Sequence, residues 1–291
     1  MLVNISSDMY VGLQNLMYLD LSYNRISKIA SGSFKDMTSL NSLYLHGNNL
    51  PNITVEFSSG PISLQTLLLW NSKIVNIAPG AFSNLTYLKT LDLWGNSISS
   101  ISSDTFKGLG QLGTLYLGYN QISSIPPGTF NNLSSLYELD LWGNRISSIS
   151  SDTFKGLGRL GLLYLGNNRI SSIAPGTFSS LTYLYTLYLD GNSLTSISPD
   201  TFAGVGNLQY LSVGYNQISG IPPGTFSSLT LLRGLDIHGN NISTITVDAF
   251  YGLKNLGSLY FASSNISNIA PGAFSSLTLL LDLDISMNNL S

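Results

Sequence analysis

Residues 139–154 read LDLWGNRISSISSDTF, and this stretch is one copy of a module that fills the chain. With the flanking Leu136 and Leu157, the module reduces to L-x-x-L-x-L-x-x-N-x-I-x-x-I-x-x-x-x-F-x-x-L. It returns every 24 residues, which predicts about twelve repeats. Its asparagine recurs at Asn24, Asn48, Asn96, Asn120, Asn144, Asn168, Asn192, Asn216, Asn240 and Asn288, and serine replaces it at Ser72 and Ser264.

The residue types of one repeat predict its shape. In L-x-L the two leucines face one side and the side chain between them faces the other, as in a β-strand. The asparagine then turns the chain, and its side-chain amide can satisfy backbone groups that the turn buries. One repeat cannot bury the leucines, isoleucines and phenylalanine alone, so the repeats must stack. We therefore predict an α/β-type solenoid with a concave parallel β-sheet and an irregular or short-helical convex side.

Composition limits the classes of function. In a repeat array each repeat packs only on its neighbours, so the length of 291 residues does not require a second domain. We therefore predict one solenoid domain over residues 1–291. A net charge of −3 with 9% charged residues argues against nucleic acid as a partner. Cysteine is absent, which excludes disulfides and thiolate metal sites. The sequence contains no apolar run of transmembrane length and no secretory signal, so we expect no membrane segment in this stretch.

Irregularities mark the ends and the second repeat. The chain starts and stops within a repeat and carries no polar or cysteine-bearing caps, so we expect a fragment of a longer protein. Uncapped ends could also self-associate. In the second repeat Phe57 comes one place early, which predicts a reshaped outer loop. A segment around His46 is echoed 192 residues later around His238, which indicates duplication of an eight-repeat block.

The repeat motif resembles the 24-residue leucine-rich repeat of the extracellular type, similar to the ectodomains of Toll-like receptors, Slit and variable lymphocyte receptors. The resemblance covers the whole chain and implies a horseshoe. It also implies a location outside the cell or at its surface, with roles such as innate immunity or cell adhesion. The cysteine-rich caps of that family are missing here.

No arrangement of residues in the sequence predicts catalysis. Gly108–Gly113 and Gly156–Gly161 match G-x-G-x-x-G, but each leads into a strand, whereas a dinucleotide site needs a helix after the glycines. The two histidines, His46 and His238, lie eight repeats apart. Neither can therefore act as the general base for a nucleophile that lies beside the other. We expect no enzyme activity, no cofactor and no metal site.

Seven N-x-[ST] sequons are compatible with a secreted glycoprotein, although about this number is expected by chance. They begin at Asn4, Asn52, Asn84, Asn132, Asn241, Asn265 and Asn289.

The strand pattern also predicts a binding surface. In L-x-x-L-x-L-x-x-N, the third, fifth, seventh and eighth positions point away from the core, and we call their surface the sheet face. All three tryptophans and both histidines stand at the seventh position. Rigid, exposed aromatics with polar tips are typical of interfaces, although duplication alone could have multiplied them. The candidate ligand-binding residues are Tyr44, His46, Leu68, Trp70, Asp92, Trp94, Tyr116, Tyr119, Asp140, Trp142, Tyr164, Tyr188, Asp190, Tyr215, Asp236, His238 and Tyr260.

Two functions remain open from the sequence. The first is a ligand-recognition ectodomain of a receptor or secreted protein, which binds a protein or a glycan on the sheet face. The second is a structural or adhesive repeat array without a signalling role. An engineered consensus-like protein is a third reading, which the irregular second repeat disfavours.

Overall fold

A computed structural model describes residues 2–290. Its contacts divide the described chain into two compact units. Unit 1 contains the residues up to Arg145 together with Lys155–Leu157, and unit 2 contains Ile146–Phe154 together with the residues from Gly158 onward.

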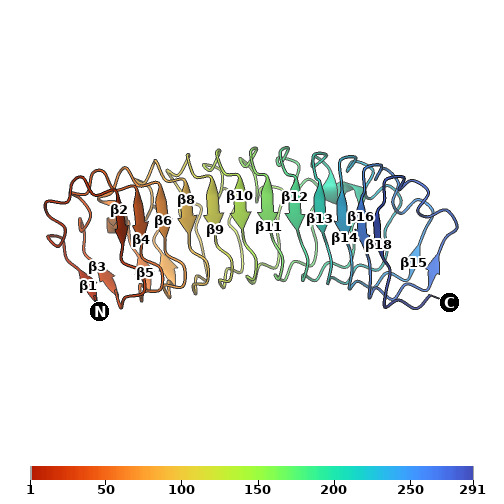
Figure 1. The fold of residues 1–291 in the computed structure, drawn as a ribbon, viewed down its shortest axis with the longest axis horizontal. Coiled ribbons are helices and arrows are strands. Elements are labelled where there is room, and N and C mark those ends of the chain that lie inside the picture. Colours follow the sequence, from red (N-terminus) through yellow and green to blue (C-terminus); the bar gives the residue numbers. More distant parts are fainter. Residues whose placement is uncertain (1, 291) are drawn as a thin grey trace. The chain divides into compact units, whose positions relative to one another are not determined.

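In unit 1 each L-x-L segment forms a three-residue strand that pairs in parallel with its neighbours in the next repeats (Figure 1). The partner of each residue lies 24 positions away, as Leu115 and Leu139 show. The six strands follow the order β10-β9-β8-β6-β4-β2. They are β2 (Tyr18–Asp20), β4 (Ser42–Tyr44), β6 (Thr66–Leu68), β8 (Thr90–Asp92), β9 (Thr114–Tyr116) and β10 (Glu138–Asp140).

Unit 2 repeats this arrangement with the order β18-β16-β14-β13-β12-β11. Its strands are β11 (Leu162–Tyr164), β12 (Thr186–Tyr188), β13 (Tyr210–Ser212), β14 (Gly234–Asp236), β16 (Ser258–Tyr260) and β18 (Asp282–Asp284).

The opposite side of each coil is mostly turns. Short parallel pairs form there at some isoleucine segments, and two 3-10 helices replace turns at two outer loops. These elements are β1 (Asn4–Ile5) with β3 (Lys28–Ile29), β5 (Asn52–Ile53) with β7 (Asn76–Ile77), β15 (Thr244–Ile245) with β17 (Asn268–Ile269), η1 (Val55–Ser58) and η2 (Pro199–Phe202). The predicted fold class, a parallel solenoid of about twelve leucine-rich turns with almost no helix, is confirmed.

The interior of each unit consists of the same side chain stacked on itself from repeat to repeat. In unit 1, Phe106 and Phe130 are buried and their ring centroids lie 6.1 Å apart. In unit 2, Phe202 and Phe226 stack at 6.0 Å. Since each ring fills the same place in its coil, one phenylalanine per repeat supplies a continuous apolar spine.

The asparagine of each turn links adjacent coils through hydrogen bonds. The Nδ2 of Asn144 donates to the carbonyls of Leu117 and Leu141, each at 3.0 Å, while its Oδ1 accepts from the Ile122 N–H at 3.0 Å. Leu117 and Ile122 belong to the preceding repeat, so one side chain satisfies buried backbone groups of two coils.

Serine makes fewer of these bonds at the exceptional turn. The Oγ of Ser72 donates to the Leu45 carbonyl of the preceding repeat at 3.0 Å, but it does not accept as Asn Oδ1 does. The Leu50 N–H bonds instead to the backbone carbonyl of Ser72 at 2.8 Å. Lys73, directly after Ser72, adopts a positive φ of 58°, and Asn265 after Ser264 does the same at 62°, whereas residues after the repeat asparagines do not. The turn therefore changes its backbone to compensate for the shorter side chain.

Candidate binding face

The candidate ligand-binding residues lie on strands or in the turns that directly follow them, on the side away from the leucines. Most are half-buried because each ring lies against its neighbours. The exposed members are Tyr119 at 52%, Tyr215 at 63% and Tyr260 at 37%. His46, which we expected at the surface, is only 9% exposed.

An aromatic group covers His46 in unit 1. The Trp70 ring stacks on the imidazole with centroids 4.2 Å apart and planes within 13° of parallel. Tyr23 meets the same imidazole edge-on at 5.2 Å, and Tyr44 lies 6.0 Å away. Burial lowers the pKa of His46, and its Nδ1 is buried without a hydrogen-bond partner. The expectation of an exposed histidine fails because the larger rings of adjacent strands close over it.

A second aromatic pair lies further along unit 1. The ring centroids of Trp94 and Tyr119 are 5.0 Å apart. A Cβ at Gly118 would come within 2.9 Å of Trp94 and 2.6 Å of the Asp140 carboxylate. Glycine at this place therefore gives both side chains the room they occupy on the sheet face.

Three tyrosines occupy backbone positions that favour glycine. At the eighth position of the repeat, Tyr23, Tyr119 and Tyr215 have φ of 50°, 50° and 49°. This left-handed conformation disfavours a large side chain, whereas glycine adopts it freely. Each ring lies against the glycine at the eighth position of the next repeat, as the contact of Tyr215 with a Cβ built on Gly239 shows at 2.7 Å. The fold alone gives no reason for tyrosine at these three turns.

The aspartates of the L-D-L segments have a structural role. Each accepts a hydrogen bond from the backbone N–H two residues ahead, as Asp92 does from Trp94 at 3.0 Å and Asp140 from Trp142 at 2.8 Å. An Asp side chain that bonds its own turn in this way stabilises the end of the strand. This contact accounts for the aspartates by the local structure of the repeat, without a role in binding.

Burial nevertheless raises the pKa of some of these aspartates. It raises the pKa of Asp140 to about 6, and the neighbouring charges of Glu138 and Asp92 act in the same direction. Burial raises the pKa of Asp92 as well. The sheet face of unit 1 is therefore a partly dry surface on which negative charge is held unfavourably.

The sheet face of unit 2 carries tyrosines instead of tryptophans. Tyr164 and Tyr188 stack with centroids 5.2 Å apart, and Tyr210 lies 5.2 Å from Tyr188. Burial raises the pKa of Tyr210 to about 12, with a further contribution from Asp236. The Nδ1 of His238 contacts the Asp236 carboxylate, so this histidine has the acidic neighbour that His46 lacks at the corresponding position.

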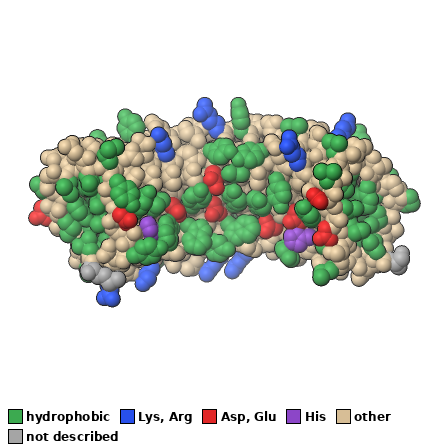
Figure 2. Space-filling model, viewed as in Figure 1, with side chains coloured by type: hydrophobic (Ala, Val, Ile, Leu, Met, Phe, Trp, Pro, Cys, Tyr) green, Lys and Arg blue, Asp and Glu red, His purple; other side chains and the backbone are tan. Residues whose placement is uncertain are grey.

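Charge is segregated on the two sheet faces, a feature that our sequence analysis missed. Within residues 18–287, the four sheet-face columns contain eight of the fifteen acidic residues of the chain and none of its twelve Lys and Arg residues. Figure 2 shows Asp and Glu in the middle of the visible face and Lys and Arg towards its margins. The columns could have revealed this if all four had been sorted by charge. The acids are Asp20, Asp92, Glu138, Asp140, Asp190, Asp236, Asp282 and Asp284.

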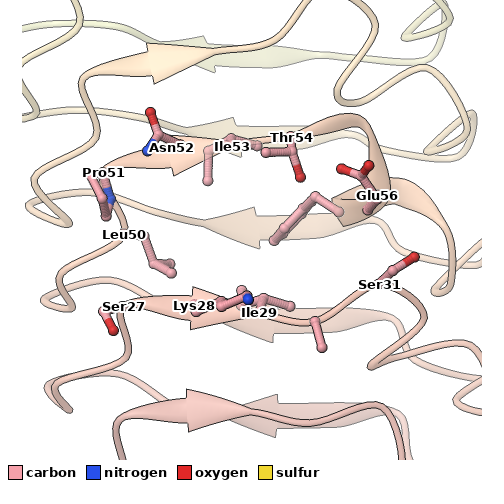
Figure 3. Close-up of a pocket in the computed structure, with 12 residues that line it drawn as sticks. Ser27, Lys28, Ile29, Ser31, Leu50, Pro51, Asn52, Ile53, Thr54 and Glu56 are labelled. Carbon is pink, nitrogen blue, oxygen red and sulfur yellow. The ribbon is translucent and has the colours of Figure 1, made fainter.

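A separate pocket of about 460 Å³ lies away from the sheet face, at the irregular second repeat. Figure 3 shows residues of β3 and β5 on opposite sides of it. Each of these strands pairs with another partner, β3 with β1 and β5 with β7, and the early Phe57 of η1 also lines the pocket. The one-residue shift of the phenylalanine thus reshapes the outer loop.

Other predicted features can be located on the structure. All seven sequon asparagines are exposed, and their use remains a prediction. Within residues 2–290, no group of three or more His, Cys, Asp or Glu side chains is placed to hold a metal ion. In the same range the structure contains no helix with the length and apolar character that a membrane crossing requires.

The stacked turns and the parallel sheet define a repeat solenoid. The family model described as Leucine rich repeat matches residues 2–50, 62–122, 86–140, 134–194, 182–242 and 230–290. The chain therefore belongs to the leucine-rich repeat family, whose fold is typically a protein-binding scaffold. Comparison with curated protein sequences gave no match.

Solved structures agree with this assignment. A leucine-rich-repeat protein of Leptospira interrogans is 28% identical, with a TM-score of 0.85 over 99% of this chain and 70% of its own. FLRT2, in a complex with Latrophilin 3 and Unc5D, is 31% identical, with a TM-score of 0.79 over 87% of this chain and 76% of the other. Mouse RP105, in a complex with MD-1, has a TM-score of 0.83 at 24% identity over 99% and 49% of the two chains. The resemblance to the extracellular-type family is confirmed.

Proposed function

We propose that the chain is the ligand-recognition region of a receptor or secreted protein, located outside the cell or at its surface. Its sheet face binds the ligand, and a protein is favoured over a glycan. FLRT2 supports this choice, because its leucine-rich repeats are found in a complex with two other proteins.

The observation that carries the proposal is the set of tyrosines at left-handed turns. Tyr23, Tyr119 and Tyr215 are 64%, 52% and 63% exposed and stand at a left-handed turn that glycine occupies in five other repeats, asparagine in two, and Ser263 and Met287 in the last two. Tyrosine at such a position costs about 1 kcal/mol or more of backbone strain. Exposed tyrosines supply large contact areas with few rotatable bonds, so a binding role accounts for their presence.

Tyr23 and Tyr119 each lie beside a tryptophan of unit 1. Tyr23 is 5.9 Å from Trp70, and Tyr119 is 5.0 Å from Trp94, measured between ring centroids. Trp and Tyr are enriched among the few residues that carry most of the binding energy at protein interfaces, and such residues cluster. We therefore assign the centre of the binding surface in unit 1 to these two pairs.

The test is a screen of the full chain against displayed secreted proteins and a glycan array. Each hit is measured again with Trp94→Ser, with Tyr119→Asn and with the control Tyr87→Ser. Tyr87 is 55% exposed in the same unit but lies outside the sheet-face columns. We expect the sheet-face variants to weaken binding by about 2 kcal/mol or more and the control to leave it unchanged. Hits that Tyr87→Ser weakens and the sheet-face variants do not would place the ligand on another surface.

A further inference from the structure

Asp190 differs from the other carboxylates of the sheet face. It stands at the seventh position of its repeat, whereas the L-D-L aspartates stand at the fifth and bond their own turns, as Asp236 does with the His238 N–H at 3.1 Å. The Oδ1 of Asp190 is buried without a hydrogen-bond partner. The residue as a whole is only half-buried, so a ligand can approach the carboxylate from solvent, although not the buried Oδ1 itself. The fold therefore leaves this carboxylate incompletely satisfied.

Small residues beside Asp190 bring other polar groups towards it. Strand register places Ser212 between Tyr188 and Asp236 at the fifth position. At the seventh position Gly214 separates Asp190 from His238, and the His238 ring leans over it, 2.7 Å from where a glycine Cβ would stand. Ser212 and Gly214 are both short. The larger polar side chains of Asp190, Asp236 and His238 therefore lie together on one part of unit 2.

Flat aromatic surfaces border this group of acids. The rings of Tyr164 and Tyr188 lie within 9° of parallel, and Tyr210 stands beside Tyr188 on the next strand. A guanidinium group is planar, so it can stack on a tyrosine face while its N–H groups bond a carboxylate in pairs. An ammonium group lacks this flat shape.

The His238 imidazole contacts Asp236, but no Lys or Arg of the sheet-face columns neutralises these groups. The sheet-face columns contain no Lys or Arg, as described above. Burial raises the pKa of Asp190, and the nearby Asp236 adds to this rise. Burial also raises the pKa of Tyr188, with Asp190 contributing. A positive group from outside would find a preorganised site of opposite charge.

We propose that Asp190, Asp236, Tyr188 and Tyr210 form a subsite on unit 2 that takes an arginine side chain of a protein partner. The guanidinium bonds the Asp190 carboxylate from the open side and stacks on the tyrosines, and Asp236 holds a second negative charge nearby. This inference deepens the proposed function by naming the chemistry of the partner. It does not depend on the tryptophans of unit 1.

The two histidines of the chain provide built-in reporters for a titration. His238 lies in the subsite and His46 lies in unit 1, so their imidazole NMR signals separate binding here from binding elsewhere. The probe is the peptide acetyl-Gly-Gly-Arg-Gly-Gly-amide, added to the full chain. Its controls carry citrulline, which is planar but neutral, or lysine, which is charged but not planar. His46→Gln assigns the signals.

We expect the arginine peptide to shift the His238 signals and leave those of His46 in place. Citrulline should weaken binding by about tenfold or more and lysine by about threefold. Asp190→Asn should weaken it by about fivefold or more. Asp248→Asn, the same change at an exposed acid of unit 2 outside the sheet face, should have no effect.

Three results would overturn the proposal. They are equal binding of the arginine and citrulline peptides, equal effects of Asp190→Asn and Asp248→Asn, and shifts at His46 without shifts at His238. In each case the screen with Trp94→Ser still decides the proposed function separately. Because burial already favours the neutral form of Asp190, Asp190→Asn should remain folded, and its unfolding midpoint checks this.

Discussion

The two sides of the same short strands, the core side and the sheet face, differ in how much their residues vary from repeat to repeat. On the core side the residue hardly changes, as the buried leucines Leu115, Leu139 and Leu163 show at one strand position. On the sheet face the neighbouring position is occupied by Tyr116, Asp140 and Tyr164 in the same three repeats. The core side stacks identical side chains, which the solenoid requires. The sheet face varies in side-chain size and charge, so the stacking of repeats does not determine which residues stand there.

The largest effect should come from the inner side. Phe106→Ala removes a fully buried ring from the phenylalanine spine of unit 1. We expect the free energy of unfolding to fall by ~3–5 kcal/mol, because a cavity remains in the coil. Urea unfolding followed by circular dichroism measures this. A loss below ~1 kcal/mol would mean that the spine is not a principal source of stability.

The turn asparagine should have the next largest effect. Asn144→Ala leaves the buried Ile122 N–H without its acceptor and removes one donor from each of the Leu117 and Leu141 carbonyls, which should cost ~1–3 kcal/mol. Asn144→Ser should be milder, since Ser72 bonds the equivalent carbonyl of Leu45. Both variants are compared in the same urea titration. Equal losses would show that the side-chain hydrogen bonds do not explain the asparagine.

A pH-dependent effect is expected on the sheet face. Burial raises the pKa of Asp140 to about 6, above its unfolded value of 3.8. The folded state therefore binds this proton more tightly, and the resulting stability is present below about pH 4 and lost as the pH rises through 6. Asp140→Asn should stabilise the protein at pH 7.5 by on the order of 2 kcal/mol relative to its effect at pH 4.

Urea unfolding of both proteins at the two pH values tests this expectation. The control is Asp104→Asn, which changes an acid of unit 1 outside the sheet face. If the difference between Asp140→Asn and the wild type is the same at both pH values, Asp140 is not held as a partly dry acid.

The sequence predicted the fold almost completely, because one 24-residue pattern fixes the strand, the turn and the spine in every repeat. It also placed Trp70 and Trp94 on the sheet face. It did not predict that His46 is covered, since stacking by Trp70 depends on rotamers across adjacent strands. The left-handed turns of Tyr119 and its counterparts were also missed, because a backbone angle shows only in the structure.

The central claim is that side chains on the core side of the strands hold the fold together, while those on the sheet face serve binding. The unfolding free energy of Tyr119→Asn tests this claim most directly. Asparagine occupies the same left-handed turn at Asn71 and Asn167. We predict stability that is unchanged or raised by up to ~1 kcal/mol, because the backbone strain of tyrosine is relieved. A loss comparable to that of Phe106→Ala would contradict the account, since it would make Tyr119 part of what holds the solenoid together.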